Sequence, residues 1–211
     1  MADYTAIVLA KAPVPGRVKT RLCPPCAPEE AAAIATGALV DTLAAVSQVS
    51  AARHLLVLDG EPGEWLPDGW EVIPQCEGGL DRRLGAAFAA ADGPAVLVGM
   101  DTPQLRADAV EAAGHAVVER ADRAVLGLAN DGGFWIVALP RGGPQHFDGV
   151  PMSKNDTGER QRRRLVDRGL SVTNVEVLMD VDSWDEAQAV AAEAPDGRFA
   201  AEVAAVAGRL P

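Results

Sequence analysis

Short apolar runs alternate along the chain with longer segments in which apolar residues recur every three or four positions. Residues 5–10 form a continuous apolar run bounded by Lys11 and two prolines, which is typical of a buried parallel strand. Residues 94–100 form the most strongly apolar run and predict another buried strand. Residues 80–91 place their apolar side chains on one stripe, as an amphipathic helix does.

The same alternation continues through the rest of the chain. Further strands are predicted at residues 54–58, 70–73, 124–128, 134–139 and 170–178. Further helices are predicted at about residues 28–48, 106–119, 157–168, 183–194 and 197–208. No linker or repeat interrupts this order, so we expect one domain over residues 1–211, with an α/β fold and a mostly parallel sheet. Ligands of such folds bind beyond the carboxyl ends of the strands, so functional motifs should follow strands directly.

Composition excludes several classes of protein. The 211-residue chain has a formal net charge of −11, with 48% hydrophobic and 23% charged residues. These values are ordinary for a soluble globular protein and exclude intrinsic disorder. The acidic balance argues against a nucleic-acid partner or an anionic membrane surface. No apolar run approaches the roughly 18 residues that span a bilayer, and we find no secretion signal, so we expect a cytoplasmic protein.

The cysteines give no clear site. Cys23 and Cys26 have the spacing of a redox motif, but they lie in a loop before a predicted helix, whereas a thioredoxin-like motif opens a helix after a strand. Cys76 and the scattered histidines supply no second pair for a zinc site. We interpret Cys23 and Cys26 as loop thiols in a reducing compartment and leave their role open.

A basic loop follows the first predicted strand. Its cations are Lys11, Arg17, Lys19 and Arg21, and Gly16 permits an unusual backbone angle between them. Two prolines stiffen the loop, and arginine can bind oxyanions through two hydrogen bonds. The loop is therefore suited to a polyphosphate, with a solvated basic loop as the alternative.

Two carboxylates follow other predicted strands. Asp101 follows the most apolar strand, and Asp182 follows the last strand with Asp180 nearby. Mg²⁺ typically binds one or two protein carboxylates and completes its coordination with phosphates and water. We predict Asp101 and Asp182 as metal ligands. The alternatives are a turn before Pro103 for Asp101 and a helix N-cap for Asp182.

Three further features are weaker. Asp131, Gly132 and Gly133 follow a strand and predict either a contact with sugar or acceptor hydroxyls or a plain turn. Gly78 and Gly79 precede a helix and predict a loop that touches the nucleotide. A helical face carries three arginines that are either solvated or part of an acceptor site: Arg160, Arg164 and Arg168.

Taken together, these motifs resemble a family of small bacterial proteins in the GT-A glycosyltransferase superfamily. The family begins with Lys-Ala-Pro-x-Pro-Gly-Arg-x-Lys-Thr-Arg-Leu, which residues 11–22 match throughout. Its Gly-x-Asp-x-Pro-x-Leu matches residues 99–105, and its Asp-x-Asp-Thr matches residues 180–183 with Ser in place of Thr. Its Asp-Gly-Gly, followed by an aromatic pair and a strand, matches residues 131–139, with Phe134 and Trp135 where tyrosines are usual. Residues 79–83 depart from the family's Gly-Asp-Leu-Gly-x-Arg, which leaves the role of that loop open.

The resemblance implies a three-layer GT-A sandwich with a mixed sheet and a nucleotide substrate. The chain is also similar to phospholactate guanylyltransferases and molybdenum-cofactor nucleotidyltransferases, in which the basic loop holds the triphosphate and the mid-chain Asp holds the metal. The resemblance also implies Mg²⁺ or Mn²⁺ at Asp101 and Asp182. It further implies nucleotide or acceptor contacts that include Ala10, Gly16 and Thr20.

Three functions remain open at this point. The first is a nucleotidyltransferase, in which a small phosphate- or phosphonate-type acceptor attacks the α-phosphorus of a nucleoside triphosphate and displaces pyrophosphate. The second is a glycosyltransferase that moves a sugar from a nucleoside diphosphate to a small acceptor, and the third is a non-catalytic nucleotide-binding protein. We favour the first because four cations suit a triphosphate better than a metal-bound diphosphate. The base, the acceptor and the oligomeric state are not readable from the sequence.

Overall fold

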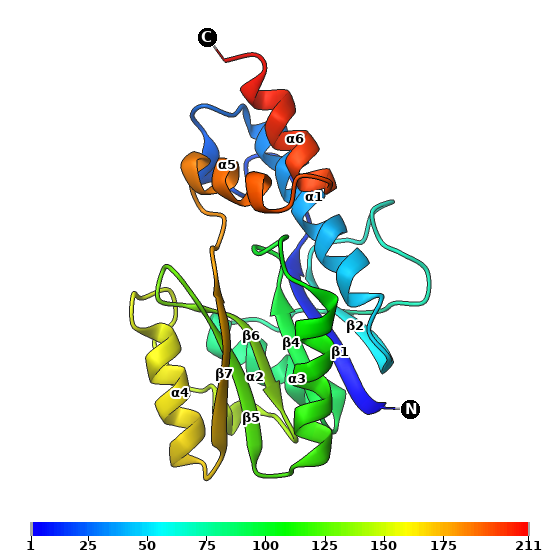
Figure 1. Ribbon diagram of the computed structural model, residues 1–211, viewed down its shortest axis with the longest axis vertical. Helices are drawn as coiled ribbons and strands as arrows, with labels where there is room; N and C mark the ends of the chain where they lie inside the picture. The colour runs from blue at the N-terminus through cyan, green and yellow to red at the C-terminus, as the bar shows by residue number, and fades with distance from the viewer. Residues whose placement is uncertain (1, 211) are drawn as a thin grey trace.

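A seven-stranded sheet forms the middle layer of the protein (Figure 1). The computed structural model describes residues 2–210. The strands are β1 (Ala2–Lys11), β2 (Ala51–Asp59), β3 (Glu71–Pro74), β4 (Ala95–Gly99), β5 (Arg123–Ala129), β6 (Phe134–Leu139) and β7 (Ser171–Leu178). Their order in the sheet is β3-β2-β1-β4-β6-β5-β7, and only the pairs that β6 makes with β4 and β5 are antiparallel. The predicted mostly parallel mixed sheet is confirmed.

Helices cover both faces of this sheet. They are α1 (Pro28–Val46), α2 (Leu80–Ala91), α3 (Ala107–Glu119), α4 (Thr157–Asp167), α5 (Trp184–Glu193) and α6 (Arg198–Ala207). Side chains of α1 and α3 pack on one face, and those of α2 and α4 pack on the other. Helices α5 and α6 lie beside α1, beyond the carboxyl ends of the strands (Figure 1). This is the three-layer α/β sandwich expected from the resemblance.

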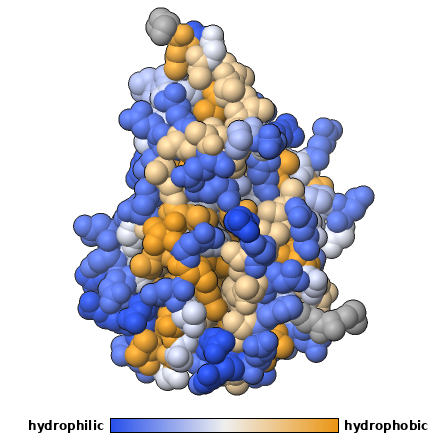
Figure 2. Space-filling view, viewed as in Figure 1, coloured by the Kyte–Doolittle hydropathy of each residue, from blue (hydrophilic) through white to orange (hydrophobic). Residues whose placement is uncertain are grey.

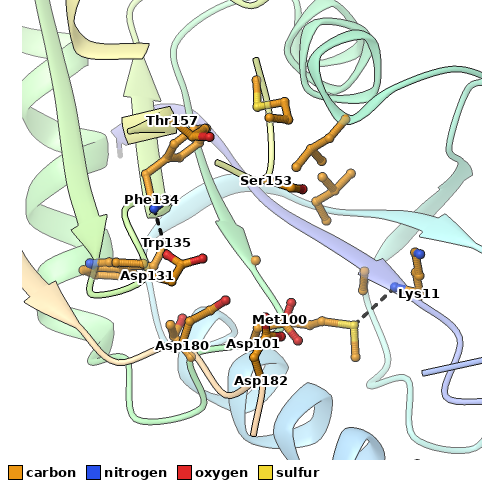
Figure 3. Close-up of a pocket in the computed structure, with 18 of the residues that line it drawn as sticks. Lys11, Met100, Asp101, Asp131, Phe134, Trp135, Ser153, Thr157, Asp180 and Asp182 are labelled. Carbon is orange, nitrogen blue, oxygen red and sulfur yellow. Dashed lines mark hydrogen bonds between the residues drawn. The ribbon is translucent and has the colours of Figure 1, made fainter. Parts of the chain in front are cut away.

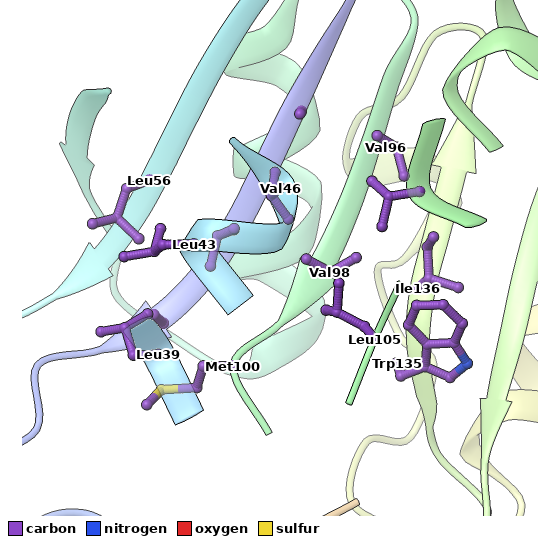
Figure 4. Close-up of a cluster of buried hydrophobic side chains, with 14 of the residues drawn as sticks. Leu39, Leu43, Val46, Leu56, Val96, Val98, Met100, Leu105, Trp135 and Ile136 are labelled. Atoms are coloured by element: carbon purple, nitrogen blue, oxygen red, sulfur yellow. The ribbon is translucent and has the colours of Figure 1, made fainter. Parts of the chain in front are cut away.

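Strand alternation divides the core into two apolar layers. On β1, Ala6 and Val8 face the layer under α1 and α3, whereas Ile7 faces the layer under α2. Figure 4 shows the first layer, in which Leu43 of α1 lies near Leu56 of β2. Because both faces of β1 are buried, its sequence is continuously apolar instead of alternating.

A third apolar cluster attaches α5 and α6 to α1. It contains Ile34 of α1, Val190 of α5 and Phe199 of α6, all essentially inaccessible to solvent. A polar link reinforces the packing, because the Asp41 carboxylate of α1 accepts hydrogen bonds from the backbone N–H groups of Arg198 (2.9 Å) and Phe199 (2.8 Å). These donors belong to the first turn of α6, whose N-cap, Gly197, has no side chain that could accept them. Asp41 thus caps a helix remote in sequence.

Two short 3-10 helices were not predicted. They are η1 (Thr20–Leu22), inside the basic loop, and η2 (Pro144–His146), inside a Gly/Pro-rich segment. A single turn of helix is too short to show an apolar repeat, so neither has a periodic signal in the sequence.

The surface shows where the apolar layers reach solvent. Figure 2 shows hydrophobic residues gathered between α3 and β7, where the partly buried Val175 and Leu178 pack against the layer under α3.

Among residues 2–210, none of the helices is both long enough and apolar enough to span a bilayer.

Asp41→Ala should lower the free energy of unfolding by about 1–2 kcal/mol, because two N–H groups at the start of α6 lose their acceptor. For a chain of this length, the melting temperature should fall by roughly 2–8 °C. Urea unfolding followed by circular dichroism measures the change. Asp41→Asn, which keeps one acceptor oxygen, is the matched control and should lose less; equal losses would attribute the effect to charge instead of hydrogen bonding.

Candidate functional site

A cavity of about 720 Å³ opens at the carboxyl edge of the sheet. The segments that follow β1, β4, β5 and β7 all contribute to its lining. These four strands are mutually parallel, so their carboxyl ends meet at one edge, although β6 runs antiparallel between β4 and β5. The four motifs found in the sequence therefore lie around one cavity.

The basic loop forms one wall. Val18 and Leu22 anchor it in the interior, and between them Lys19 takes a left-handed backbone conformation (φ 46°, ψ 35°) where η1 begins. Lys11 and Arg17 are exposed and have no ion-pair partner among residues 2–210. These two cations are free to meet an anion in the cavity.

The carboxylates form the facing wall. Figure 3 shows Asp101, after β4, beside Asp180 and Asp182, after β7. The two segments are tied together by a hydrogen bond from the Val181 N–H to the Asp101 carbonyl (3.0 Å). A second bond, from the Asp180 N–H to the Asn130 side-chain oxygen (3.2 Å), joins them to the end of β5. The acidic wall is thus fixed by its own backbone.

Both predicted metal ligands have cationic partners. The Lys19 ammonium contacts the Asp101 carboxylate and also the Val181 carbonyl, and the Lys19 side chain is only 6% exposed. Arg21 donates to the Asp182 carboxylate at 2.5 Å, but the Arg21 side chain is 76% exposed. Of the four predicted phosphate-binding cations, Lys19 and Arg21 therefore already contact carboxylates.

Asp182 is not the helix N-cap that the sequence left open as an alternative. Ser183 takes that place, with its hydroxyl accepting from the Glu186 N–H and the Glu186 carboxylate accepting from the Ser183 N–H at 2.7 Å. These two reciprocal hydrogen bonds form a capping box. The carboxylate of Asp182 consequently points to Arg21 and the cavity instead of the helix.

The acidic wall brings together the carboxylates of Asp101, Asp180 and Asp182. Burial, and to a smaller extent the neighbouring Asp101 carboxylate, raises the pKa of Asp180 to about 7 against the opposing effect of Lys19. Oxygen-rich walls of this kind are chemically suited to Mg²⁺, which takes hard oxygen ligands. Residues 2–210 hold no ready cluster of three or more His, Cys, Asp or Glu side chains for a metal. Two carboxylates nevertheless fit Mg²⁺, because substrate phosphates and water commonly supply its other ligands.

The Asp131 loop forms the far end of the cavity. Its turn is closed by a hydrogen bond from the Gly133 N–H to the Asp131 carboxylate (2.7 Å). The segment before α4 lies directly on this loop, since a Cβ at Gly132 would be 2.0 Å from the Asn155 carbonyl oxygen. Gly132 also has φ +89°, which favours glycine. Both the turn and the close contact require this residue.

The loop before α2 forms the remaining wall through an unpredicted network. The Gln75 side chain donates to the carbonyls of Ala10 (2.7 Å) and Val57 (3.2 Å), at the ends of β1 and β2. Arg83 of α2 donates to the Gln75 side-chain oxygen (2.8 Å) and to the Gly78 carbonyl (3.1 Å). This network orders the loop in which the chain departs from the family pattern.

Most of the predicted residues line the cavity. Those that do are Ala10, Lys11, Arg17, Lys19, Thr20, Arg21, Gly78, Asp101, Asp131, Gly133 and Asp182. Gly16, Gly79 and Gly132 belong to the same loops but do not line it. Lining residues that the sequence analysis missed are Gln75, Arg83, Ser153, Lys154 and Asn155. The segment 153–155 shows no motif in the sequence, and tertiary contacts such as that of Asn155 with Gly132 place it here.

The arginines of α4 do not line the cavity. Arg160 pairs with Asp156 one turn earlier, and Arg164 donates to the Asp148 carbonyl at 2.6 Å. Cys23 and Cys26 are free thiols, and Cys26 is buried in the cluster beneath α5 and α6. Burial raises the pKa of the Cys26 thiol, which disfavours its reactive thiolate.

Residues 37–154 match a bacterial family described as "Uncharacterized protein conserved in bacteria (DUF2064)". The matched region is more than half of the chain. The chain belongs to this family. Its basic loop lies before the matched region, whereas Asp101 and Asp131 lie within it. None of the curated proteins matches the chain.

Several solved structures share the fold. A candidate nucleotide-diphospho-sugar transferase from Desulfovibrio desulfuricans G20 is 20% identical, with a TM-score of 0.85 over 98% of this chain and 96% of that one. CMP:2-keto-3-deoxy-manno-octonic acid synthetase, solved with CTP, is 15% identical, with a TM-score of 0.58 over 92% and 99%. A nucleotidyl transferase from Methanothermobacter is 15% identical, with a TM-score of 0.54 over 87% and 94%. At these identities the likeness is one of fold.

Gly132→Ala should destabilise the protein by about 2–3 kcal/mol, because alanine must take a positive φ and its Cβ meets the Asn155 backbone. The melting temperature should fall by roughly 4–12 °C. Gly99→Ala is the matched control, since a Cβ at this lining position meets nothing within 4 Å. Similar melting temperatures for the two variants would show that the segment before α4 does not press on the Asp131 loop.

Proposed function

We propose that the protein is a magnesium-dependent nucleotidyltransferase. It joins the nucleoside monophosphate part of a nucleoside triphosphate to a small acceptor that carries a phosphate or phosphonate group, and it releases pyrophosphate. The observation that carries this proposal is the meeting of a cationic wall and a carboxylate wall in one cavity at the carboxyl edge of the sheet. Its volume of about 720 Å³ is within the usual range for small-molecule sites.

The cationic wall binds the triphosphate. Lys11 and Arg17 have no competing ion pair among residues 2–210, so they are the first cations that the phosphates meet. Lys19 and Arg21 also bind the phosphates once they exchange their carboxylate partners, Asp101 and Asp182, for phosphate oxygens. Backbone groups of Ala10, Thr20 and Gly78 line the cavity and contact the nucleotide in this proposal. Gly16 and Gly79 lie in the adjoining loops and would act by shaping them.

The carboxylate wall binds the metal. Asp101 and Asp182 would hold Mg²⁺ or Mn²⁺, which neutralises phosphate charge and orients the transferred group. The Asp131 loop, with Gly132 and Gly133, orients the acceptor at the far end of the cavity. An oxygen of the acceptor attacks the α-phosphorus and forms a new P–O bond. The bond from the α-phosphorus to the bridging oxygen breaks, and pyrophosphate leaves with that electron pair. Positioning and charge neutralisation drive the step, and no protein nucleophile is needed.

Transfer of a sugar from a nucleoside diphosphate is the second candidate. It is favoured by Asp131, an exposed carboxylate in the cavity that can accept hydrogen bonds from sugar or acceptor hydroxyls. The shared fold with a candidate nucleotide-diphospho-sugar transferase agrees with this alternative.

Thermal unfolding with Mg²⁺ and a panel of nucleotides tests the two candidates. A ligand at 100 times its Kd adds about 2.7 kcal/mol to stability, a rise of roughly 5–10 °C for a chain of this length. We expect that rise with one nucleoside triphosphate, followed by pyrophosphate release when an acceptor is supplied. A rise confined to a sugar nucleotide would replace the first candidate with the second, and no rise with any nucleotide would contradict both.

Asp101→Asn should lower the rate of pyrophosphate release by about 100-fold or more, because the metal loses a charged ligand. A coupled pyrophosphate assay at saturating Mg²⁺ measures it. Asp108→Asn is the matched control, since Asp108 is exposed on α3, pairs with Arg106 and does not line the cavity. Full activity in Asp101→Asn would contradict the proposed role of this carboxylate.

Arg17→Met should weaken binding of a nucleoside triphosphate more than binding of the corresponding sugar nucleotide, because the triphosphate carries more charge toward the cationic wall. Calorimetric titration of the variant and the native protein with both ligands gives the two ratios. Equal losses would favour the glycosyltransferase. Arg160→Met, on α4 outside the cavity, controls for the change in net charge.

A further inference from the structure

The Lys19 ammonium contacts the same Asp101 carboxylate that would hold the metal in the proposed function. It contacts one oxygen of the Asp101 carboxylate and the carbonyl oxygen of Val181, the residue between Asp180 and Asp182. A carboxylate oxygen together with a backbone carbonyl oxygen is the kind of surrounding that hard divalent cations prefer. Lys19 therefore takes up the oxygen ligands that connect the end of β4 to the end of β7.

The position of Lys19 is built into the loop and is not a chance surface contact. Its side chain is 6% exposed, and its backbone takes a left-handed conformation (φ 46°) that non-glycine residues rarely adopt. Val18 and Leu22 are buried on either side of it. By contrast, Arg21 reaches Asp182 from solvent with a side chain that is 76% exposed, and exposed pairs of this kind contribute little.

We propose that Lys19 is the resident cation of the metal site and keeps Asp101 closed to metal until a nucleotide binds. This inference rests on the proposed function, since it concerns the same metal and the same nucleotide. With a metal and a nucleotide bound, Asp101 would hold the metal, and Lys19 would exchange the Asp101 oxygen for a phosphate oxygen. Each charged group then exchanges one partner of opposite sign for another.

Charge balance explains why the exchange needs both ligands. Metal alone would leave the largely buried ammonium of Lys19 beside a divalent cation and without its carboxylate, which is costly. Nucleotide alone would draw Lys19 away and leave Asp101 uncompensated beside Asp180 and Asp182. Metal and nucleotide therefore bind cooperatively through Lys19, and each raises the affinity for the other.

Direct measurement of Mn²⁺ binding to the nucleotide-free protein tests this inference without any turnover. Free Mn²⁺ is followed by electron paramagnetic resonance in titrations of the native protein, Lys19→Met and Lys11→Met. We expect Lys19→Met to bind Mn²⁺ about tenfold or more tightly than the native protein, because the competing cation is gone. Lys11→Met removes the same charge from the same cavity, but from a side chain that does not contact the carboxylates, so its affinity should change far less.

Two further variants serve as controls for folding and for the location of the metal. Lys19→Gln keeps a donor for the Val181 carbonyl but carries no charge, so it should also bind Mn²⁺ more tightly and provides the measurement where Lys19→Met does not fold. Lys19→Met combined with Asp101→Asn should lose the gain, which locates the metal at Asp101. Circular dichroism and thermal unfolding establish that each variant is folded.

The possible outcomes separate the inference from the proposed function. If Lys19→Met and Lys19→Gln bind Mn²⁺ no more tightly than the native protein or Lys11→Met, Lys19 does not close the site, while the proposed function can still stand on Mn²⁺ binding and pyrophosphate release. If none of the proteins binds Mn²⁺, with or without a nucleoside triphosphate, the metal site of the proposed function and the inference fail together.

Discussion

The contact of the Lys19 ammonium with Asp101 and the Val181 carbonyl is the interaction on which the cavity depends. It joins three segments that are remote in the sequence: the loop after β1, the end of β4 and the segment after β7. Without a cation at this point, the carboxylates of Asp101, Asp180 and Asp182 would have less compensation for their close approach. The pKa of Asp180 is raised to about 7 first by burial and then by Asp101, and Lys19 opposes that rise. Hydrogen bonds hold the backbone of the acidic wall, and the basic loop that faces it supplies the charge compensation.

Topology brings these segments together. Because β6 runs antiparallel between β4 and β5, the strand pair β5–β7 is returned to the same direction as β1 and β4. Helices α5 and α6 then close the structure above the strand ends by packing on α1, and Val181 is buried in that cluster. Asp182 is therefore positioned from both sides, by β7 before it and by the capping box of α5 after it.

The sequence was sufficient for the fold because local patterns and global topology agree. Buried strands such as β4 are continuously apolar, and the rule that ligands meet strand ends located all four motifs at one edge. It was insufficient for residues whose place depends on tertiary contacts. Gln75 and Arg83 form no motif, and Ser153 lines the cavity in a segment whose Asn155 lies against Gly132. The pairing of Lys19 was also unreadable, since a motif names a cation but not the anion that it meets.

The division of the four cations into two kinds links the site to the acidic character of the chain. At a formal net charge of −11, a polyanion approaches the protein against its average field, so exposed cations must attract it locally. Lys11 and Arg17 are in that position. Lys19 and Arg21 instead contact the carboxylates of the facing wall, and under the proposed function they would reduce the repulsion between those carboxylates and the phosphates of the nucleotide. One short loop can therefore attract an anion with two of its charges and compensate the opposite wall with the other two. A loop of four free cations opposite an uncompensated acidic wall would be less stable in the absence of substrate, because neither wall would have a counter-charge.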